Sequence, residues 1–304
     1  TTLGGNDVIL GGHLGDVINA GDGDNVVLGD DAMIDYVRGE RDGVTSGADT
    51  NAADIDLITS LSTTAAGGAD TITTGSGHDI VVGGRFGDTI IAGSGNNLVV
   101  GDSGEITAAN EDANRRGTQS ITVGRIETNT FGDGGIDTIT TLGGHDIILG
   151  GHDNDGINAG EGDNVVIGDD AAIDFVLRER GLVTPGADTN AEDIDLITSL
   201  STTAAGGADT ITTGNGNDIV IGGRYGDTIT GGAGRNIVIG DSGTIIAANE
   251  DANRFGAQTI TVGQLKTIEF GDGGIDYITT LGGNDVVLGG HLGDTIDAGD
   301  GDNV

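Results

Sequence analysis

The chain lacks the residues on which most globular domains of its size depend. Its 304 residues contain no cysteine, no tryptophan and a single proline, and aromatic residues make up 3%. Without cysteine there are no disulfides and no thiol chemistry. The scarcity of large side chains excludes a core of conventional thickness. The remaining apolar residues are mostly Ile, Val, Leu and Ala, which suit thin, tightly wound strands when combined with 61 glycines.

Basic residues and long apolar runs are also scarce. Only 12 Lys and Arg oppose 49 Asp and Glu, so the net charge is −37. Nucleic acid is excluded as a partner, because phosphate binding needs Lys and Arg. No apolar run is long enough to span a bilayer. A compact chain with this charge repels itself, so it either stays disordered or is neutralised by cations.

A long tandem repeat organises the whole chain. The segment TTLGGND at Thr1 returns at Thr140 as TTLGGHD and at Thr279 as TTLGGND, and the offset is 139 in both cases, with no insertion or deletion. The segment 279–304 matches the segment 1–26 at 23 positions. Copies this similar are typical of a long tandem array with one mechanical role. Because the chain begins inside a repeat, we expect it to be a window from a longer, giant tandem-repeat protein.

A shorter period of nine lies inside each long copy. Nineteen positions in this register carry Asp or Asn, and Ile or Val stands two residues after each of the first eighteen. Glycines cluster one to five residues before each position. The positions are Asp7, Asp16, Asn25, Asp70, Asp79, Asp88, Asn97, Asp137, Asp146, Asp155, Asn164, Asp209, Asp218, Asp227, Asn236, Asp276, Asp285, Asp294 and Asn303.

This pattern predicts a solenoid. A glycine-rich bend permits positive φ and close backbone packing, and the short strand that follows points one β-branched side chain inward. Two bends and two strands then make one coil, which contains two nonapeptides. Stacked coils form two parallel sheets, with strands about 4.8 Å apart and the Ile and Val row between the sheets. The predicted fold class is all-β: a parallel β-roll, or β-solenoid, interrupted by β-hairpin insertions.

The same geometry predicts calcium binding. Carboxylates two nonapeptides apart stack on one edge of neighbouring coils, where an unneutralised row is unfavourable. Ca²⁺ takes six to eight oxygen ligands, which carboxylates and the carbonyls of a glycine bend can supply. We therefore predict that all nineteen positions hold Ca²⁺, in pairs such as Asp70 with Asp88 and Asp79 with Asn97. An Asn ends each block, and we expect it to weaken the last site or to mark the end of a short stack of about four nonapeptides.

The residues at this point resemble a known family. Gly11–Asn19 and Gly83–Ile91 follow the frame G-G-x-G-x-D-x-U-x of the RTX, or haemolysin-type, calcium-binding nonapeptides. The resemblance covers about half of the chain. Leu14 and Phe86 depart from the pattern, because they stand where the family has its fourth-position glycine. The resemblance implies a β-roll, Ca²⁺ as the cofactor, and an extracellular or cell-surface protein of the adhesin or matrix type.

Insertions separate the nonapeptide blocks. Roll blocks are predicted over 1–29, 67–102, 132–168, 206–241 and 271–304, and insertions over 30–66, 103–131, 169–205 and 242–270. Strands are predicted inside the insertions over 32–37, 54–59, 105–107 and 120–126. We expect them to pair as hairpins that project from the roll or lie on it. The insertions either make lateral contacts or cap each short stack.

A compact acidic cluster recurs in two of the insertions. Its members are Asp49, Asn51, Asp54, Asp56, Asp188, Asn190, Asp193 and Asp195. Both an extra calcium loop and a solvated acidic turn fit this cluster.

Catalytic motifs are missing from the sequence. Gly101-Asp102-Ser103-Gly104 resembles a serine-protease nucleophile motif, but it lies where a coil is expected to close into a turn. HExxH and the phosphate-binding loop are absent, and the five histidines lack zinc spacing. We therefore expect no enzyme.

Three functions remain after this exclusion. The chain is a structural protein of a fibre, surface layer or matrix that assembles with copies of itself, the extender stalk of an adhesin secreted by a type I pathway, or the RTX tail of a secreted toxin or hydrolase. All three share folding that calcium triggers outside the cell.

Overall fold

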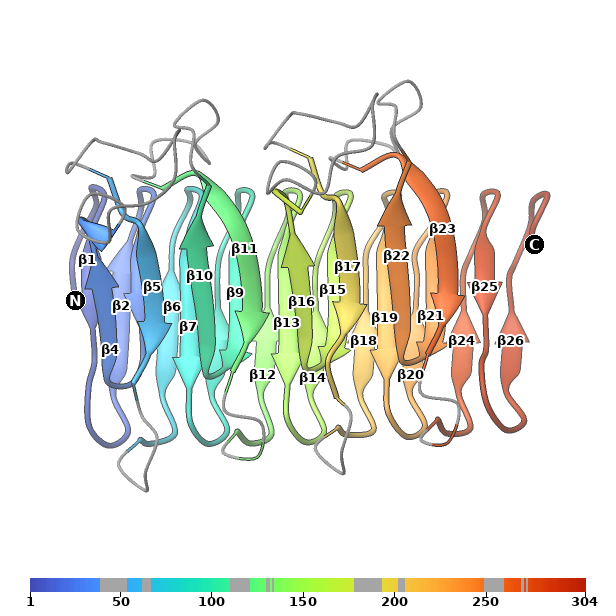
Figure 1. Ribbon diagram of the computed structural model, residues 1–304, viewed down its shortest axis with the longest axis horizontal. Helices are drawn as coiled ribbons and strands as arrows, with labels where there is room; N and C mark the ends of the chain where they lie inside the picture. Colours follow the sequence, from blue (N-terminus) through green and yellow to red (C-terminus); the bar gives the residue numbers. More distant parts are fainter. Residues whose placement is uncertain are drawn as a thin grey trace.

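The protein is a rod of three β-sheets, as seen in a computed structural model (Figure 1). The structure describes residues 1–38, 54–61, 67–109, 121–129, 132, 134–177, 193–201, 206–248, 260–268, 271 and 273–304. The 26 elements assigned in these residues are all β-strands, which confirms the predicted all-β class. The strands lie across the long axis of the rod, and the two ends of the chain lie at its opposite ends.

Two nine-stranded parallel sheets form the roll. The outer sheet consists of β2 (Val17–Gly21), β6 (Thr71–Thr74), β8 (Thr89–Ile91), β12 (Thr138–Thr140), β14 (Gly156–Asn158), β18 (Thr210–Thr212), β20 (Thr228–Thr230), β24 (Tyr277–Thr279) and β26 (Thr295–Asp297). The middle sheet consists of β1 (Val8–Leu10), β3 (Val26–Leu28), β7 (Ile80–Gly84), β9 (Leu98–Asp102), β13 (Ile147–Gly151), β15 (Val165–Asp169), β19 (Ile219–Gly223), β21 (Ile237–Asp241) and β25 (Val286–Leu288).

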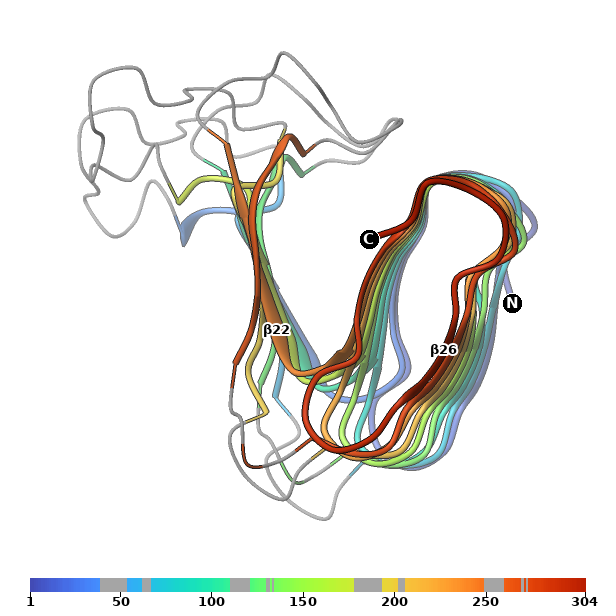
Figure 2. The ribbon, with the colours of Figure 1, turned by 90° about the vertical axis from the view of Figure 1, so that its right-hand side faces the viewer.

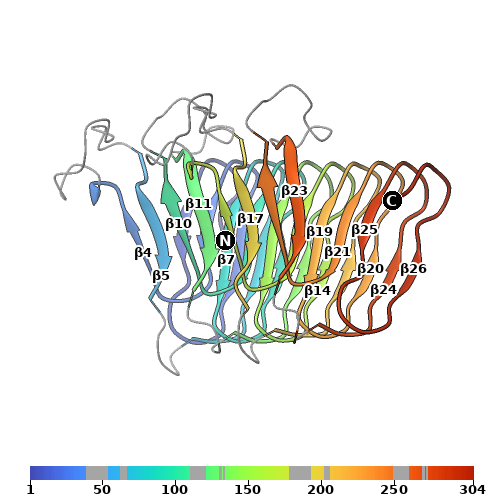
Figure 3. The same ribbon diagram turned by 45° about the vertical axis from the view of Figure 1, so that its right-hand side comes forward.

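The third sheet is antiparallel and is built from the insertions. In spatial order, this insertion sheet contains β4 (Ala32–Asp35), β5 (Leu57–Ser60), β10 (Gly104–Ala108), β11 (Val123–Thr128), β16 (Ala171–Asp174), β17 (Leu196–Ser199), β22 (Gly243–Ala247) and β23 (Val262–Thr267). The predicted hairpins form, since β4 pairs with β5 and β10 with β11. Successive hairpins also pair with one another, as β5 does with β10 and β11 with β16. The result is one sheet that follows the rod (Figure 3).

The expectation of separate short stacks is wrong, because the roll continues across every insertion. Val26 pairs with Ile80 across the first insertion, and Leu98 pairs with Ile147 across the second. The chain leaves a bend at the start of each insertion and returns to the same bend at its end. The roll strands before and after the insertion therefore keep their parallel pairing. An Asn therefore does not end a stack, and the insertions do not act as caps.

Viewed along the rod, the roll is a flattened loop with the insertion sheet beside it (Figure 2). The first core lies between the outer and middle sheets and contains the predicted Ile and Val row, including Ile72, Val81, Ile90 and Val99. This confirms the coil of two bends and two strands. Four strands of the outer sheet, β6, β12, β18 and β20, contain Thr-Ile-Thr, and the central Ile of each is buried in this core.

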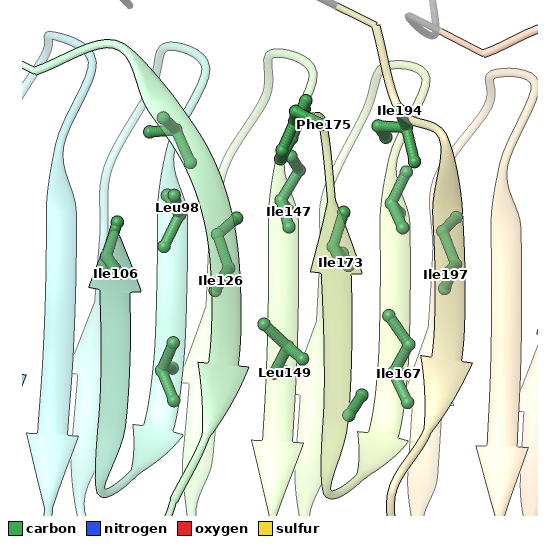
Figure 4. Close-up of a cluster of buried hydrophobic side chains, with 14 of the residues drawn as sticks. Leu98, Ile106, Ile126, Ile147, Leu149, Ile167, Ile173, Phe175, Ile194 and Ile197 are labelled. Atoms are coloured by element: carbon green, nitrogen blue, oxygen red, sulfur yellow. The ribbon is translucent and has the colours of Figure 1, made fainter. Parts of the chain in front are cut away.

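A second core lies between the middle sheet and the insertion sheet, and the sequence interpretation did not include it. Each middle strand carries three apolar residues in succession, so the first and third point away from the roll interior. These side chains pack against apolar residues of the insertion sheet, as Leu98, Ile147 and Leu149 do near Ile106 and Ile126 (Figure 4). The middle sheet is therefore buried on both faces from β3 to β21, whereas the terminal strands β1 and β25 are partly exposed.

Candidate functional site

The nineteen predicted ligands lie on two separate edges of the roll. The bends that lead into the outer sheet form the all-aspartate edge, with Asp16, Asp70, Asp88, Asp137, Asp155, Asp209, Asp227, Asp276 and Asp294. The bends that lead into the middle sheet form the alternating edge, with Asp7, Asn25, Asp79, Asn97, Asp146, Asn164, Asp218, Asn236, Asp285 and Asn303. Along this second edge each Asp is followed by an Asn.

A ladder of hydrogen bonds connects the carboxylates of the all-aspartate edge. The backbone N–H of each Asp donates to Oδ1 of the Asp in the next coil, at 2.7 Å from Asp70 to Asp88 and at 2.7 Å from Asp88 to Asp137. The ladder crosses the insertions without a change, since Asp155 donates to Asp209 in the same way at 2.7 Å. The predicted pairs of this edge, such as Asp70 with Asp88, therefore lie side by side. Further pairs, such as Asp155 with Asp209, connect neighbouring coils across an insertion.

The second oxygen of these carboxylates is buried and has no hydrogen-bond partner. This holds for Oδ2 of Asp16, Asp70, Asp88, Asp137, Asp155, Asp209, Asp227 and Asp276, and on the alternating edge for Oδ2 of Asp7, Asp79 and Asp218. Buried carboxylate oxygens without partners are costly, so such atoms call for a ligand. Asp88 and Asp227 are 1% and 0% exposed, and bulk water cannot replace that ligand.

Backbone oxygens lie beside these unpaired atoms. A methyl group added to Gly29 would stand 2.1 Å from Oδ2 of Asp70 and 2.4 Å from the carbonyl oxygen of Gly83 in the next coil. The equivalent methyl on Gly101 would stand 2.1 Å from Oδ2 of Asp137 and 2.4 Å from the carbonyl oxygen of Gly150. Only glycine leaves this oxygen-lined space free. A carboxylate with carbonyl oxygens is the donor set that Ca²⁺ prefers, so the residues fit that ion.

Charge repulsion along this edge is strong without a cation. Burial, with the neighbouring Asp137, raises the pKa of Asp88 to about 9, and burial with Asp209 raises the pKa of Asp227 to about 10. Burial raises the pKa of Asp276 to about 7. The hydrogen bonds from backbone N–H groups lower these pKa values but do not offset burial. At neutral pH the row must therefore take up protons, bind cations or unfold.

The structure adds four carboxylates that the sequence interpretation missed. Asp30, Asp102, Asp169 and Asp241 follow the first glycine of each bend from which an insertion leaves. Asp30 accepts the N–H of Gly68, at 3.0 Å, where the chain re-enters the bend, and that of Arg85, at 2.7 Å, in the next coil. Burial and the nearby Asp137 raise the pKa of Asp102. The sequence does contain the signal: Gly-Asp replaces Gly-Gly wherever an insertion begins.

The departures from the fourth-position glycine do not disturb the bends. Leu14 and Phe86 adopt φ of 70° and 68°, in the left-handed region that favours glycine. Asp153, Tyr225 and Leu292 do the same at equivalent positions, with φ of 72°, 66° and 75°. A left-handed residue that is not glycine costs about 1–2 kcal/mol, which the stacked coils on either side offset.

The acidic cluster is described only in part. Asp49, Asn51, Asp188 and Asn190 lie outside the described residues. Asp54 and Asp56 are buried, at 3% and 7% exposed, and so are Asp193 and Asp195, at 4% and 2%. The solvated acidic turn is therefore wrong for these four side chains, and the extra calcium loop stays a prediction.

No described part of the chain gathers three or more His, Cys, Asp or Glu side chains in a geometry that could hold a metal ion. A cation at either edge would therefore depend on backbone oxygens in addition to carboxylates. This agrees with rows of single carboxylates that lie beside glycine bends.

Comparison with known families identifies these coils. The family described as RTX calcium-binding nonapeptide repeat (4 copies) matches residues 64–90, 73–105, 131–166, 203–224 and 212–244. The chain contains RTX repeats. The matched segments fall on the predicted roll blocks, and the coils at 1–29 and 271–304 continue the same sheets. No curated protein matches the chain.

The RTX repeat family binds calcium, and RTX repeats are typical of secreted or extracellular proteins. The expectation of an RTX β-roll is therefore confirmed. In the part of the chain that the structure describes, no helix is long and apolar enough to cross a membrane.

Proposed function

We propose that this chain is an extracellular structural element that folds when it binds Ca²⁺ and then acts as a stiff rod in a fibre, surface layer or matrix. The observation that carries the proposal is the row of buried carboxylates, each with Oδ2 unpaired beside a backbone carbonyl. A chain with a net charge of −37 has no reason to form this row unless cations enter it.

Calcium supplies the charge that neutralises the row, and the chain's own residues prepare the place for it. On the all-aspartate edge the ladder of N–H groups fixes Oδ1 of each Asp, and the first glycine of each bend keeps the space next to Oδ2 open. Because this arrangement exists only in stacked coils, the free energy of ion binding becomes free energy of folding.

The mechanical role is supported by the continuity of the rod. All three sheets cross the boundary between the first and second long copies, through the pairs Leu98 with Ile147, Ile139 with Ile157, and Arg125 with Asp174. Copies joined in this way share three continuous sheets. Assembly into a giant array, or with copies of itself, is part of the proposal. We also propose that the chain is not an enzyme.

Two alternatives share the calcium-dependent fold. The rod also suits the extender stalk of a type I-secreted adhesin, since an unbroken solenoid separates its two ends well. An RTX tail of a secreted toxin or hydrolase fits less well, because long and nearly identical copies do not serve it.

The experiment is a calcium titration of the metal-free 304-residue chain, followed by circular dichroism and by electron microscopy. We expect a transition from disorder to β-structure that a chelator reverses, and rods or fibres in calcium. An unchanged spectrum in excess EGTA would contradict calcium-dependent folding. Monomers that stay isolated at high calcium would favour the stalk over the fibre.

A further inference from the structure

The outward face of the outer sheet carries two rows of side chains, one on each side of the central Ile row. Because side chains alternate along a strand, the residues before and after each central Ile point away from the roll. Threonine occupies most of these positions, and we call the surface the threonine face. From β2 to β26 its rows are Val17, Thr71, Thr89, Thr138, Gly156, Thr210, Thr228, Tyr277 and Thr295, and Asn19, Thr73, Ile91, Thr140, Asn158, Thr212, Thr230, Thr279 and Asp297.

The parallel register places these threonines directly beside one another. Thr71 pairs with Thr89, and Thr210 pairs with Thr228. Thr89 also pairs with Thr138, although an insertion separates the two in the sequence. Hydroxyl groups therefore repeat at about 4.8 Å from strand to strand and at about 6.6 Å along each strand, which makes a two-dimensional array.

The threonine face is nearly flat. Viewed along the rod, the strands of the outer sheet lie almost one behind another (Figure 2). An ordinary open sheet rotates by about 20–25° from strand to strand, and that twist would destroy a regular array. Threonine is β-branched, so its χ1 angle is also restricted. The array is thus formed before a ligand arrives, and little conformational entropy is lost on binding.

The threonine face carries almost no charge, although the net charge of the chain is −37. Among its positions only Asp297 is charged at neutral pH. Thr89, Thr138, Thr210 and Thr228 are exposed, so their hydroxyl groups are available to a ligand. A face of this kind suits a neutral, extended ligand that repeats hydrogen-bonding oxygens at the same spacings.

A second copy of the chain is a poor occupant of this face. Nine strands at about 4.8 Å, each with about 10 Å of length, give roughly 430 Å². Two such faces would bury roughly 860 Å², which is less than the about 1,200 Å² of a stable protein interface. Tyr277 is the only aromatic residue on the face, whereas aromatic anchors are enriched at the centres of protein interfaces.

We propose that the threonine face binds ice. Its two spacings are close to repeats between oxygen atoms on the prism face of hexagonal ice. Each hydroxyl both donates and accepts a hydrogen bond, as a water molecule of the lattice does. An ice surface is also uncharged and extended, so it matches a long neutral face and needs no pocket. This activity goes beyond the proposed calcium-dependent rod, which serves as its rigid support.

One interruption of the array provides a way to raise the activity. Tyr277 is 57% exposed and stands where the preceding copy has Thr138. It pairs with Thr228 on one side and with Thr295 on the other. A ring that protrudes from a flat surface holds ice away from both neighbours. Removal of this ring should therefore improve binding, and a new ring elsewhere on the face should weaken it.

The test measures thermal hysteresis and the shape of single ice crystals with the 304-residue chain in saturating calcium. We expect a hysteresis gap and faceted crystals for the wild type. Thr89→Tyr should lose most of the gap, and Tyr277→Thr should widen it. Met33→Tyr is the control, because Met33 is exposed on the insertion sheet, on the opposite side of the rod (Figure 2). It should keep the wild-type gap.

Two results would overturn the proposal. The first is a folded wild-type rod that neither shapes ice crystals nor shows hysteresis, and the second is an equal gap for Thr89→Tyr and Met33→Tyr. Circular dichroism in calcium verifies that each variant is folded, and if Thr89→Tyr is not, the wild type and Tyr277→Thr still decide. Paired rods in sedimentation that Thr89→Tyr separates, without any effect on ice, would assign the face to a second copy instead.

Discussion

The outer and middle sheets of the roll have the same number of strands but bury very different amounts of apolar surface. In the outer strand β12, Ile139 is buried, while Thr138 is exposed and Thr140 is half-buried. In the middle strand β13 every residue is buried, including Ile147, Ile148 and Leu149. Burial of an aliphatic side chain contributes about 1.5–3 kcal/mol, so burial stabilises a middle strand by roughly three times as much as an outer strand.

The bends that lead into the two sheets also differ in charge. The poorly buried outer sheet follows the all-aspartate edge, where every coil carries a carboxylate, and the well-buried middle sheet follows the alternating edge, where every second coil carries the neutral amide of an Asn. The sheet that buries less apolar surface therefore follows the edge with more charge to neutralise. The comparison teaches that the insertion sheet, which covers the middle sheet, supports the half of the roll whose bends carry fewer carboxylates.

The largest effect should come from removing calcium. We expect excess chelator at neutral pH to unfold the roll, because the carboxylate row then has no counter-charge. During a stepwise titration, backbone amides of β8 and β12 should lose protection at a higher calcium concentration than those of β9 and β13. Hydrogen–deuterium exchange measures this order, and simultaneous loss in both sheets would break the comparison.

Acid should partly replace calcium. The pKa values of Asp70, Asp209 and Asp276 are raised by burial to about 6, 7 and 7, and that of Asp88 to about 9. A raised folded-state pKa contributes stability that is fully present below the ordinary value of 3.8 and is lost as pH rises through the folded value. In chelator, we therefore expect β-structure to decrease as pH rises from 4 to 9.

Circular dichroism in EDTA across this range is the measurement. A metal-free chain that is more ordered at pH 8 than at pH 5 would contradict the assigned burial of these carboxylates. The same series in saturating calcium is the control, and there the fold should persist at neutral pH.

Truncation of one core side chain should have an intermediate effect. Ile139→Ala removes the only apolar side chain that β12 buries, at a cost of about 2–5 kcal/mol, and should raise the calcium midpoint of folding. Ile173→Ala, on the insertion sheet, should cost a similar amount while shifting the calcium midpoint less. Thermal unfolding in calcium and calcium titrations separate the two effects. Equal shifts in midpoint would show that both cores support the ion-binding edge alike.

The smallest effect should come from the solvent-facing rows of the outer sheet. Thr210 and Thr228 are exposed, so Thr210→Ala and Thr228→Ala should change stability by no more than about 0.5 kcal/mol. Ile219→Ala, which removes a buried side chain facing the insertion sheet, should cost about 2–5 kcal/mol. Thermal unfolding of the three variants checks the difference between an open and a covered face.

Much of this architecture could be predicted from the sequence because its periodicities are local. The spacing of nine placed Asp70 beside Asp88, and it placed Ile72 and Ile90 in one core. The second core was missed, although its signal was present: Ile80, Val81 and Val82 form an apolar triplet where the outer sheet has Thr-Ile-Thr. An unbroken apolar run is typical of a strand that is covered on both faces.

The sequence by itself determined the coil, the direction of its inward row and the residue type on each edge, since each depends on a spacing of one or two nonapeptides. Only the tertiary structure decided that the stack continues through the insertions, because Asp30 and its equivalents close bends whose two halves are far apart in sequence. It also decided which oxygens remain unpaired. The nineteen predicted calcium ligands lie on two edges of the roll, and the hydrogen bonds of each carboxylate depend on the residues of the neighbouring coil.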